Sequence, residues 1–226
     1  MKYRITGNTM QALDILLGRG ESVITESGGM AWYKGRVDMK TNMPGGVLGG
    51  LGRALSGESL FMTTYTSQSD DTVITFTPEA PGSIISYTLA QGQAIIAQRD
   101  SFMCAQSDVS LSVHFQKRLG AGLFGGEGFI LQRVTGPGVA FFEIDGEARE
   151  VELGAGETMR VDPGHIALFE ASVQHSIESV KGVANALFGG EGLFLATLTG
   201  PGKVWLQTMP LNNLIAKIAS RIPRSS

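Results

Sequence analysis

The alternation of apolar and polar residues along the chain predicts β-strands. In residues 109–115, Val, Leu, Val and Phe occupy every second position between Ser, Ser and His, which is the period of a half-buried strand. Residues 73–77 and 83–89 are rich in β-branched and aromatic side chains, which also favours strands. Thr-Gly-Pro-Gly at 135–138 and 199–202 supplies turn residues. Short strands separated by such turns are typical of a sandwich or barrel.

The hydrophobic period changes to that of a helix after Pro210. The apolar residues at this spacing are Leu211, Leu214, Ile215, Ile218 and Ile222. They predict a short amphipathic helix over residues 210–222, with Lys217 and Arg221 among its other positions. Such a helix packs on its own body, on a neighbour or on a membrane surface. We favour packing on protein, because the basic charge is modest for lipid binding.

The chain contains an internal repeat. Residues 123–138 and 187–202 lie 64 residues apart, and 11 of their 16 positions are identical. The same offset relates Gly82 to Gly146 and Leu89 to Leu153. A more diverged copy precedes these two, since Leu-Gly-Arg-Gly-Glu at 17–21 resembles Leu-Gly-Ala-Gly-Glu at 153–157. The repeat predicts three tandem units, roughly 10–77, 78–141 and 142–209, within a single body 1–226.

The two ends of the repeat suggest how the body closes. Residues 11–17 resemble residues 147–153, so we expect the N-terminal strand to complete the third unit. Closure of this kind removes an exposed sheet edge. The predicted fold class is therefore all-β, with three tandem β units in one closed sandwich or barrel and a short C-terminal helix.

Composition narrows the function classes. The formal charge of -3 gives no support to nucleic-acid binding by phosphate neutralisation. Glycine is abundant, at 31 of 226 residues, and clusters in short groups as in tight turns. The single cysteine, Cys104, excludes an intrachain disulfide and fits a reducing compartment. No signal peptide or membrane-spanning run is recognised, so we expect a cytoplasmic protein with at most peripheral membrane contact.

The repeated Leu-Phe-Gly-Gly-Glu-Gly motif and the stretch at 49–61 resemble the bacterial branch of the altered-inheritance-of-mitochondria family, a group of uncharacterised proteins. The resemblance covers essentially the whole chain. It implies a short double-stranded β-helix fold, with three units like the subunit of the tryptophan RNA-binding attenuation protein. The fungal mitochondrial member is linked to inner-membrane organisation and respiratory assembly. The family assigns no catalytic residue, and the chain lacks a lysine-rich repeat that would copy the RNA surface.

Three glutamates occupy equivalent loop positions of the three units: Glu58, Glu127 and Glu191. Around a threefold axis they would offer oxygen ligands to a cation. The favoured interpretation is structural, with each carboxylate accepting hydrogen bonds from the backbone of its own glycine loop, because hard cations normally gather more than three oxygens.

The same loops carry large apolar residues, namely Leu51, Leu55, Leu123, Phe124, Leu187 and Phe188. If they are exposed they form apolar patches for a partner or a membrane, and if they fold back they cap the core. With Leu214 and Ile218 of the predicted helix, they are the candidate interaction residues.

His165 and His175 are weak candidates for a metal site, together with an acid such as Glu170. A paired His-x-His is absent, and a catalytic zinc needs about three protein ligands close together. His175 alternates with Val173 and Ile177, which favours a hydrogen-bonded core histidine. Cys104 lies between Met103 and Ala105 and is expected to be a buried, inert thiol. Gly-Gly-Glu-Gly lacks the Gly-Lys-Ser/Thr ending of a phosphate loop.

Three functions remain open on these observations. The first is a non-enzymatic homo-oligomeric scaffold that contacts itself or another protein through the apolar loops and the helix. The second is a small-molecule or lipid binding module, which requires an enclosed apolar pocket. The third is a metal-dependent enzyme of cupin-like architecture. We predict the first, with no catalytic residue and no cofactor.

Overall fold

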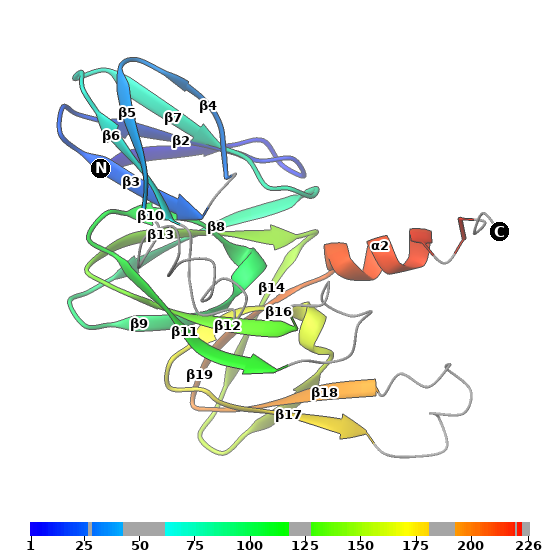
Figure 1. The fold of residues 1–226 in the computed structure, drawn as a ribbon. Helices are drawn as coiled ribbons and strands as arrows, with labels where there is room; N and C mark the ends of the chain where they lie inside the picture. Colours follow the sequence, from blue (N-terminus) through cyan, green and yellow to red (C-terminus); the bar gives the residue numbers. More distant parts are fainter. Residues whose placement is uncertain (27–28, 43–61, 118–127, 181–192, 220, 223–226) are drawn as a thin grey trace.

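The chain is almost entirely β-structure with one short C-terminal helix (Figure 1), which confirms the predicted fold class in its main features. The computed structural model describes residues 1–26, 29–42, 62–117, 128–180, 193–219 and 221–222. Their strands form four sheets, here called A to D.

Sheets A and D are the smaller two, and they lie at opposite ends of the body in Figure 1. Sheet A contains, in spatial order, β1 (Lys2–Thr6), β2 (Ala12–Leu17), β7 (Thr72–Phe76) and β4 (Met30–Lys34). Sheet D contains β15 (Thr158–Val161), β18 (Leu193–Thr199) and β17 (Gln174–Val180).

Sheets B and C lie between them and have six strands each. Sheet B contains β5 (Val37–Asn42), β6 (Met62–Ser67), β3 (Ser22–Glu26), β10 (Phe102–Gln106), β13 (Gly138–Asp145) and β8 (Gly82–Leu89). Sheet C contains β11 (Ser110–Lys117), β12 (Phe129–Thr135), β9 (Ala94–Gln98), β16 (Ile166–Glu170), β19 (Gly202–Gln207) and β14 (Ala148–Leu153). The 3-10 helices η1 (Arg99–Ser101) and η2 (Pro163–His165) precede β10 and β16, and α2 (Leu211–Ala219) follows β19.

Three hydrophobic cores fill the spaces between successive sheets. Leu13 and Phe76 of sheet A pack with Met103 and Phe141 of sheet B. Sheets B and C share a second core, and sheets C and D a third. Sheets B and C are therefore buried on both faces, and β10 and β16 each begin with four consecutive buried residues instead of alternating.

The strand register repeats along the chain with the 64-residue spacing of the sequence. Ser110 lies opposite Thr135 in β11–β12, and Gln174 lies opposite Thr199 in β17–β18. The pairs β10–β13 and β16–β19 also have their irregularity at the same point. Strands β2–β7, β8–β13 and β14–β19 are therefore called the first, second and third units.

A tight turn at the same place in each unit explains part of the glycine pattern. Gly20, Gly92 and Gly156 have φ of 83°, 75° and 77°, a region that disfavours side chains. In the next position Glu21 accepts a hydrogen bond from the amide of Gly18, and Glu157 accepts one from that of Gly154. These repeated residues therefore serve the backbone.

The prediction that the N-terminal strand completes the third unit is wrong. That strand, β2, pairs with β1 on one side and with β7 on the other, so it opens the first unit. Its equivalent in the third unit is β14, which pairs with β19. Residues 11–17 resemble residues 147–153 because both stretches begin a unit. Among the described strands the sheets stay open, since β4 and β15 each have one partner.

Candidate functional site

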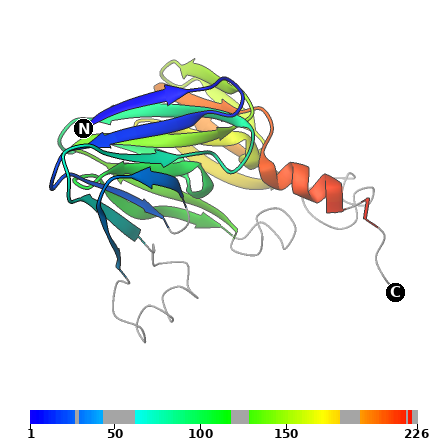
Figure 2. The ribbon, with the colours of Figure 1, turned by 90° about the horizontal axis from the view of Figure 1, so that it is seen from above.

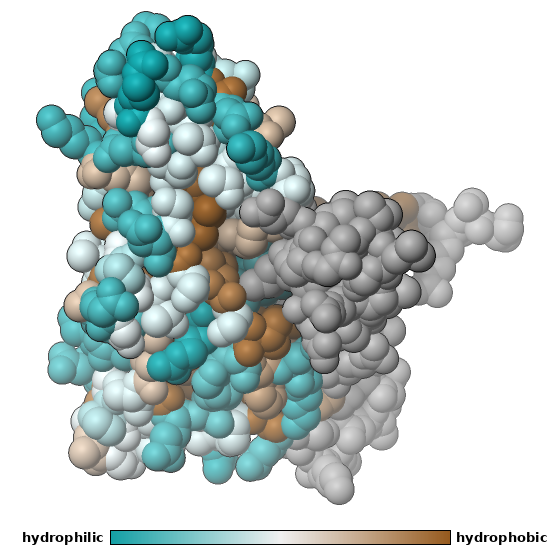
Figure 3. Space-filling view, turned by 60° about the vertical axis from the view of Figure 1, so that its left-hand side comes forward, coloured by the Kyte–Doolittle hydropathy of each residue, from teal (hydrophilic) through white to brown (hydrophobic). Residues whose placement is uncertain are grey.

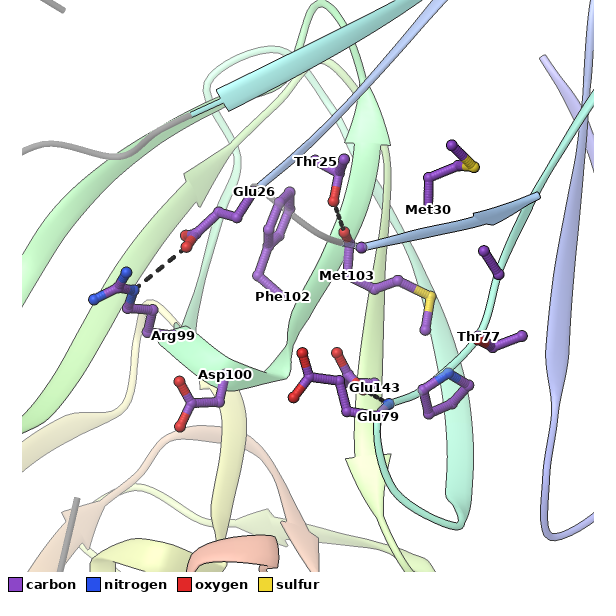
Figure 4. Close-up of a pocket in the computed structure, with 13 residues that line it drawn as sticks. Thr25, Glu26, Met30, Thr77, Glu79, Arg99, Asp100, Phe102, Met103 and Glu143 are labelled. Atoms are coloured by element: carbon purple, nitrogen blue, oxygen red, sulfur yellow. Dashed lines mark hydrogen bonds and ion pairs between the residues drawn. The ribbon is translucent and has the colours of Figure 1, made fainter. Parts of the chain in front are cut away.

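An acidic cleft of about 390 Å³ lies where the first and second units meet. Its charged lining residues are Glu26 at the end of β3, Glu79 before β8, Arg99 and Asp100 of η1, and Glu143 of β13. Figure 4 shows Glu79, Asp100 and Glu143 on one side of this cleft and the Glu26–Arg99 pair on the other. Glu26, Glu79 and Asp100 outnumber the single guanidinium of Arg99, which gives the cleft a negative potential that suits a cationic group.

The Glu26 side of the cleft is tied together by charge-assisted bonds between the two units. Arg99 Nε donates to Glu26 Oε2 at 3.3 Å, and the buried amide Nε2 of Gln132 donates to Glu26 Oε1 at 2.5 Å. Thr25 Oγ1 donates to the carbonyl oxygen of Met103 at 2.6 Å nearby. These contacts join β3 to the second unit, so Glu26 acts as a structural link.

Glu143 is the most perturbed acid of the cleft. Its pKa is raised to about 8, mainly by burial and further by the neighbouring acids Glu79, Asp145 and Asp100, while a hydrogen bond from the Glu79 amide at 2.8 Å opposes the shift. In the third unit Gln207 takes the equivalent place, where its Oε1 accepts from the Asp145 amide at 3.1 Å. The donor to Gln207 lies two positions further along its unit than the donor to Glu143, so both side chains accept a backbone amide hydrogen but from different residues, and a neutral amide suffices as the acceptor at Gln207.

A second cavity of about 300 Å³ shares Glu79, Asp100 and Glu143 with the cleft and reaches the start of α2. The carboxylate of Asp145 accepts the Leu211 amide hydrogen at 2.7 Å and thereby caps the first turn of α2. Burial raises the pKa of Asp145, and the bond from Leu211 opposes this shift. Glu143 thus holds the backbone before β8, and Asp145 holds the start of α2.

The metal hypothesis finds no support in the described part of the chain, which holds no group of three or more His, Cys, Asp or Glu side chains arranged for a metal ion. His165 Nδ1 donates to the Gln207 carbonyl at 2.7 Å. Glu170 accepts from Tyr87 Oη at 3.2 Å and from the Lys203 amide at 3.0 Å. His165 is thus engaged in a hydrogen bond within the third unit, and Glu170 in hydrogen bonds to both the second and the third unit.

His175 lies in an aromatic cluster, with ring centroids 5.3 Å from His114, 5.2 Å from Phe115 and 5.5 Å from Phe169. Burial lowers its pKa, and so does the neighbouring His114. Cys104 is fully buried in the core between sheets A and B, and burial raises its pKa well above the usual value. A thiol in this state is a poor nucleophile.

The apolar face of α2 is exposed, as the sequence-based choice of interaction residues requires. Leu214, Ile215 and Ile218 are exposed on the helix, and Ile222 follows it. Figures 1 and 2 both show α2 projecting from the body, with its first turn next to the sheets. The helix therefore does not bury this face on its own body.

Strand β4 is a second exposed apolar element, which the sequence analysis missed. Trp32 and Tyr33 are 58% and 50% exposed at the edge of sheet A. The sequence held a signal for this element, because Trp32 and Tyr33 align in the repeat with Cys104 and Ala105. Figure 3 also shows hydrophobic residues in the middle of one face of the body, bordered by hydrophilic ones. Apolar surface is thus present on the body as well as on α2.

The other candidate interaction residues and the loop glutamates lie outside the described residues. These are Leu51, Leu55, Leu123, Phe124, Leu187 and Phe188, with Glu58, Glu127 and Glu191.

A family profile described as mitochondrial biogenesis AIM24 matches residues 3–209. The chain belongs to this family. The resemblance inferred from the glycine motifs is thereby confirmed. A crystal structure of the Streptococcus pyogenes protein SPYM3_0169 superposes with a TM-score of 0.80 at 22% identity, covering 98% of this chain and 99% of that one. At this identity the likeness establishes the fold alone. A search of the curated proteins found no match.

None of the described helices has the length and hydropathy needed to cross a bilayer.

Proposed function

We propose that this family member is a non-enzymatic scaffold that assembles with copies of itself and contacts another protein. The observation that carries the proposal is the exposure of large apolar side chains on two regular elements, α2 and β4. Exposed apolar patches on a folded body commonly mark interaction surfaces. We place this scaffold in the cytoplasm, for which the single cysteine is the supporting observation.

The first alternative, a lipid or small-molecule binding module, requires an enclosed apolar pocket. The two cavities described above are lined by several carboxylates, a lining that suits a cation better than an acyl chain. The second alternative, a metal-dependent enzyme, lacks support for the reasons given for His165 and Glu170.

Native mass spectrometry on protein purified without chelator tests the proposal, because it reports the number of subunits and any bound mass together. A defined homo-oligomer without a stoichiometric adduct supports the scaffold. A monomer that carries a stoichiometric metal or organic adduct overturns it.

The nature of the partner for α2 is tested separately with vesicles of anionic phospholipid. A protein partner predicts that the chain stays in the supernatant when the vesicles are sedimented. If it sediments, and Ile218→Glu abolishes this while Met10→Glu at another exposed site does not, the surface of α2 is a membrane contact instead.

A further inference from the structure

The two middle sheets are each assembled from two units in the same way. In sheet B the half β5-β6-β3 of the first unit joins the half β10-β13-β8 of the second unit through antiparallel pairing of β3 with β10. In sheet C the half β11-β12-β9 joins β16-β19-β14 through pairing of β9 with β16. The chain thus contains the same junction twice.

The two end sheets are the unjoined halves of a third such junction. Sheet D, in the order β17-β18-β15, corresponds strand by strand to the halves β5-β6-β3 and β11-β12-β9. Strand β15 thus takes the place of β3 and β9, the strands that form the junctions. Sheet A, apart from β1, has the order β4-β7-β2 and corresponds to the halves β10-β13-β8 and β16-β19-β14. Strand β4 thus takes the place of β10 and β16. In the described residues β4 pairs with β7 alone and β15 with β18 alone.

Side chains of β4 are exposed at positions where the equivalent side chains of β10 and β16 are buried. The shared irregularity of β4, β10 and β16 makes Trp32 equivalent to Cys104 and Leu168. Cys104 and Leu168 are fully buried, whereas Trp32 is 58% exposed. The next position repeats the contrast, because Ala105 and Phe169 are fully buried while Tyr33 is 50% exposed. These positions are covered wherever the junction is formed.

From this geometry we infer that β4 of one copy pairs with β15 of a second copy, head to tail, and forms the third junction between molecules. The inference deepens the proposed scaffold and rests on it. A second copy is the occupant because it alone supplies the missing half sheet, and because sheets A and D lie at opposite ends of one chain (Figure 1). A long exposed edge with aromatic residues is otherwise an aggregation hazard.

The register follows from the junctions inside the chain. Leu168 lies opposite Ala97, and Phe169 lies opposite Ile96. Transferred to the end strands, this places Trp32 opposite Val161 and Tyr33 opposite Arg160. The aromatic ring of Tyr33 then meets a guanidinium, a favourable contact. Because each copy pairs through two different edges, β4 at one end and β15 at the other, repeated pairing yields either a closed ring or an open filament.

Disulfide trapping between two variants tests the pairing and its register. Directly opposed residues of an antiparallel pair have Cα atoms about 4.5–5.5 Å apart, which a disulfide spans. One copy carries Trp32→Cys and the other Val161→Cys, and the buried Cys104 stays in place. We expect a cross-linked dimer under mild oxidation in the mixture and in neither variant alone. The control mixture pairs Val161→Cys with Met39→Cys, at an exposed site of edge strand β5, and should stay uncross-linked.

Native mass spectrometry of Trp32→Glu completes the test, with Met39→Glu as the matched control. We expect Trp32→Glu to reduce the oligomer to monomer and Met39→Glu to leave it intact, with both variants folded by circular dichroism. If Val161→Cys folds poorly, Trp32→Glu alone decides: an unchanged oligomer contradicts the junction.

The possible results distinguish failure of the β4–β15 pairing from failure of the proposed homo-oligomeric scaffold. A disulfide-linked dimer of Trp32→Cys alone shows that β4 pairs with β4 of another copy and overturns the inference. A variant that carries Trp32→Cys and Val161→Cys in one chain tests closure within the chain, and an intrachain disulfide in it also overturns the inference. A wild-type oligomer without cross-linking in the mixture overturns the junction and leaves the scaffold standing. A wild-type chain that is monomeric at every concentration overturns both.

Discussion

Glu143 and its equivalent in the next unit, Gln207, are different hydrogen-bond acceptors at one position of the repeat. The carboxylate and its equivalent, Gln207, both accept a backbone amide hydrogen, yet only the glutamate titrates. Its neighbours Glu79, Asp100 and Asp145 are acids, and burial is the largest cause of its raised pKa. A buried charge that the fold does not need makes stability depend on pH.

We predict that Glu143→Gln stabilises the protein at alkaline pH. A folded pKa of about 8 against an unfolded value near 4.5 means that the folded state holds the proton more tightly. The stability that comes from this proton is fully present below about pH 4.5 and is lost as pH rises through about 8, for a total on the order of 5 kcal/mol. Urea unfolding from pH 4 to pH 9 should show wild type losing stability relative to the variant. Parallel curves for the two proteins would contradict the prediction.

Gly136 illustrates a glycine required by close approach. A Cβ at this position would lie 2.6 Å from the carbonyl oxygen of Ala90 and 2.6 Å from Leu89 Cβ. Gly136→Ala should therefore destabilise the fold by about 1–3 kcal/mol. The matched control is Gly154→Ala, because Ala90 already occupies the equivalent turn position and a Cβ there meets only Glu157 at 3.6 Å. Thermal unfolding that ranks the two variants equally would refute this reading.

At the scale of elements, the neighbours of a strand decide whether it is apolar on one face or on both. β10 and β16 are covered on both faces, whereas β11 alternates between exposed and half-buried residues. β4 has the sequence of a covered strand at the edge of an end sheet. Its aromatic residues are explained by an intermolecular junction better than by the monomer.

The helix α2 depends on the strand before it through Asp145. We predict that Asp145→Ala lowers the free energy of opening the first turn of α2 by about 1 kcal/mol, because the Leu211 amide loses its acceptor. Asp145→Asn keeps a side-chain oxygen and should behave more like wild type. Hydrogen exchange of the α2 amides measures the effect, and unchanged protection in Asp145→Ala would show that the cap is dispensable.

At the scale of the whole molecule, sheets B and C each belong to two units, and no unit has a core built from its own strands alone. Contacts such as the Arg99–Glu26 ion pair also cross from the second unit to the first. A body built in this way should unfold as one cooperative system.

The two tryptophans allow a direct test of this cooperativity. Trp32 lies in the first unit and Trp205 in the third. We predict that the single-tryptophan variants Trp32→Phe and Trp205→Phe give fluorescence transitions in denaturant that each coincide with the far-UV circular dichroism transition of the same variant. A fluorescence midpoint separated from that transition would instead indicate units that unfold independently.

Local and repeated features could be predicted from the order of the amino acids. Alternation, turn residues and the period after Pro210 are local properties, and they predicted an all-β chain with a terminal helix. The glycine motifs identified the family over residues 3–209.

Which strands pair with each other became clear only in the folded chain, because pairing joins residues far apart in the sequence. The tertiary structure placed β2 within the first unit, where similarity of residues 11–17 to residues 147–153 had suggested closure of the third. It also left Trp32 and Tyr33 exposed on β4, although equivalent positions are buried in the other units. Exposure of these side chains depends on the neighbouring strand, and no local pattern records whether that neighbour is present in the same chain.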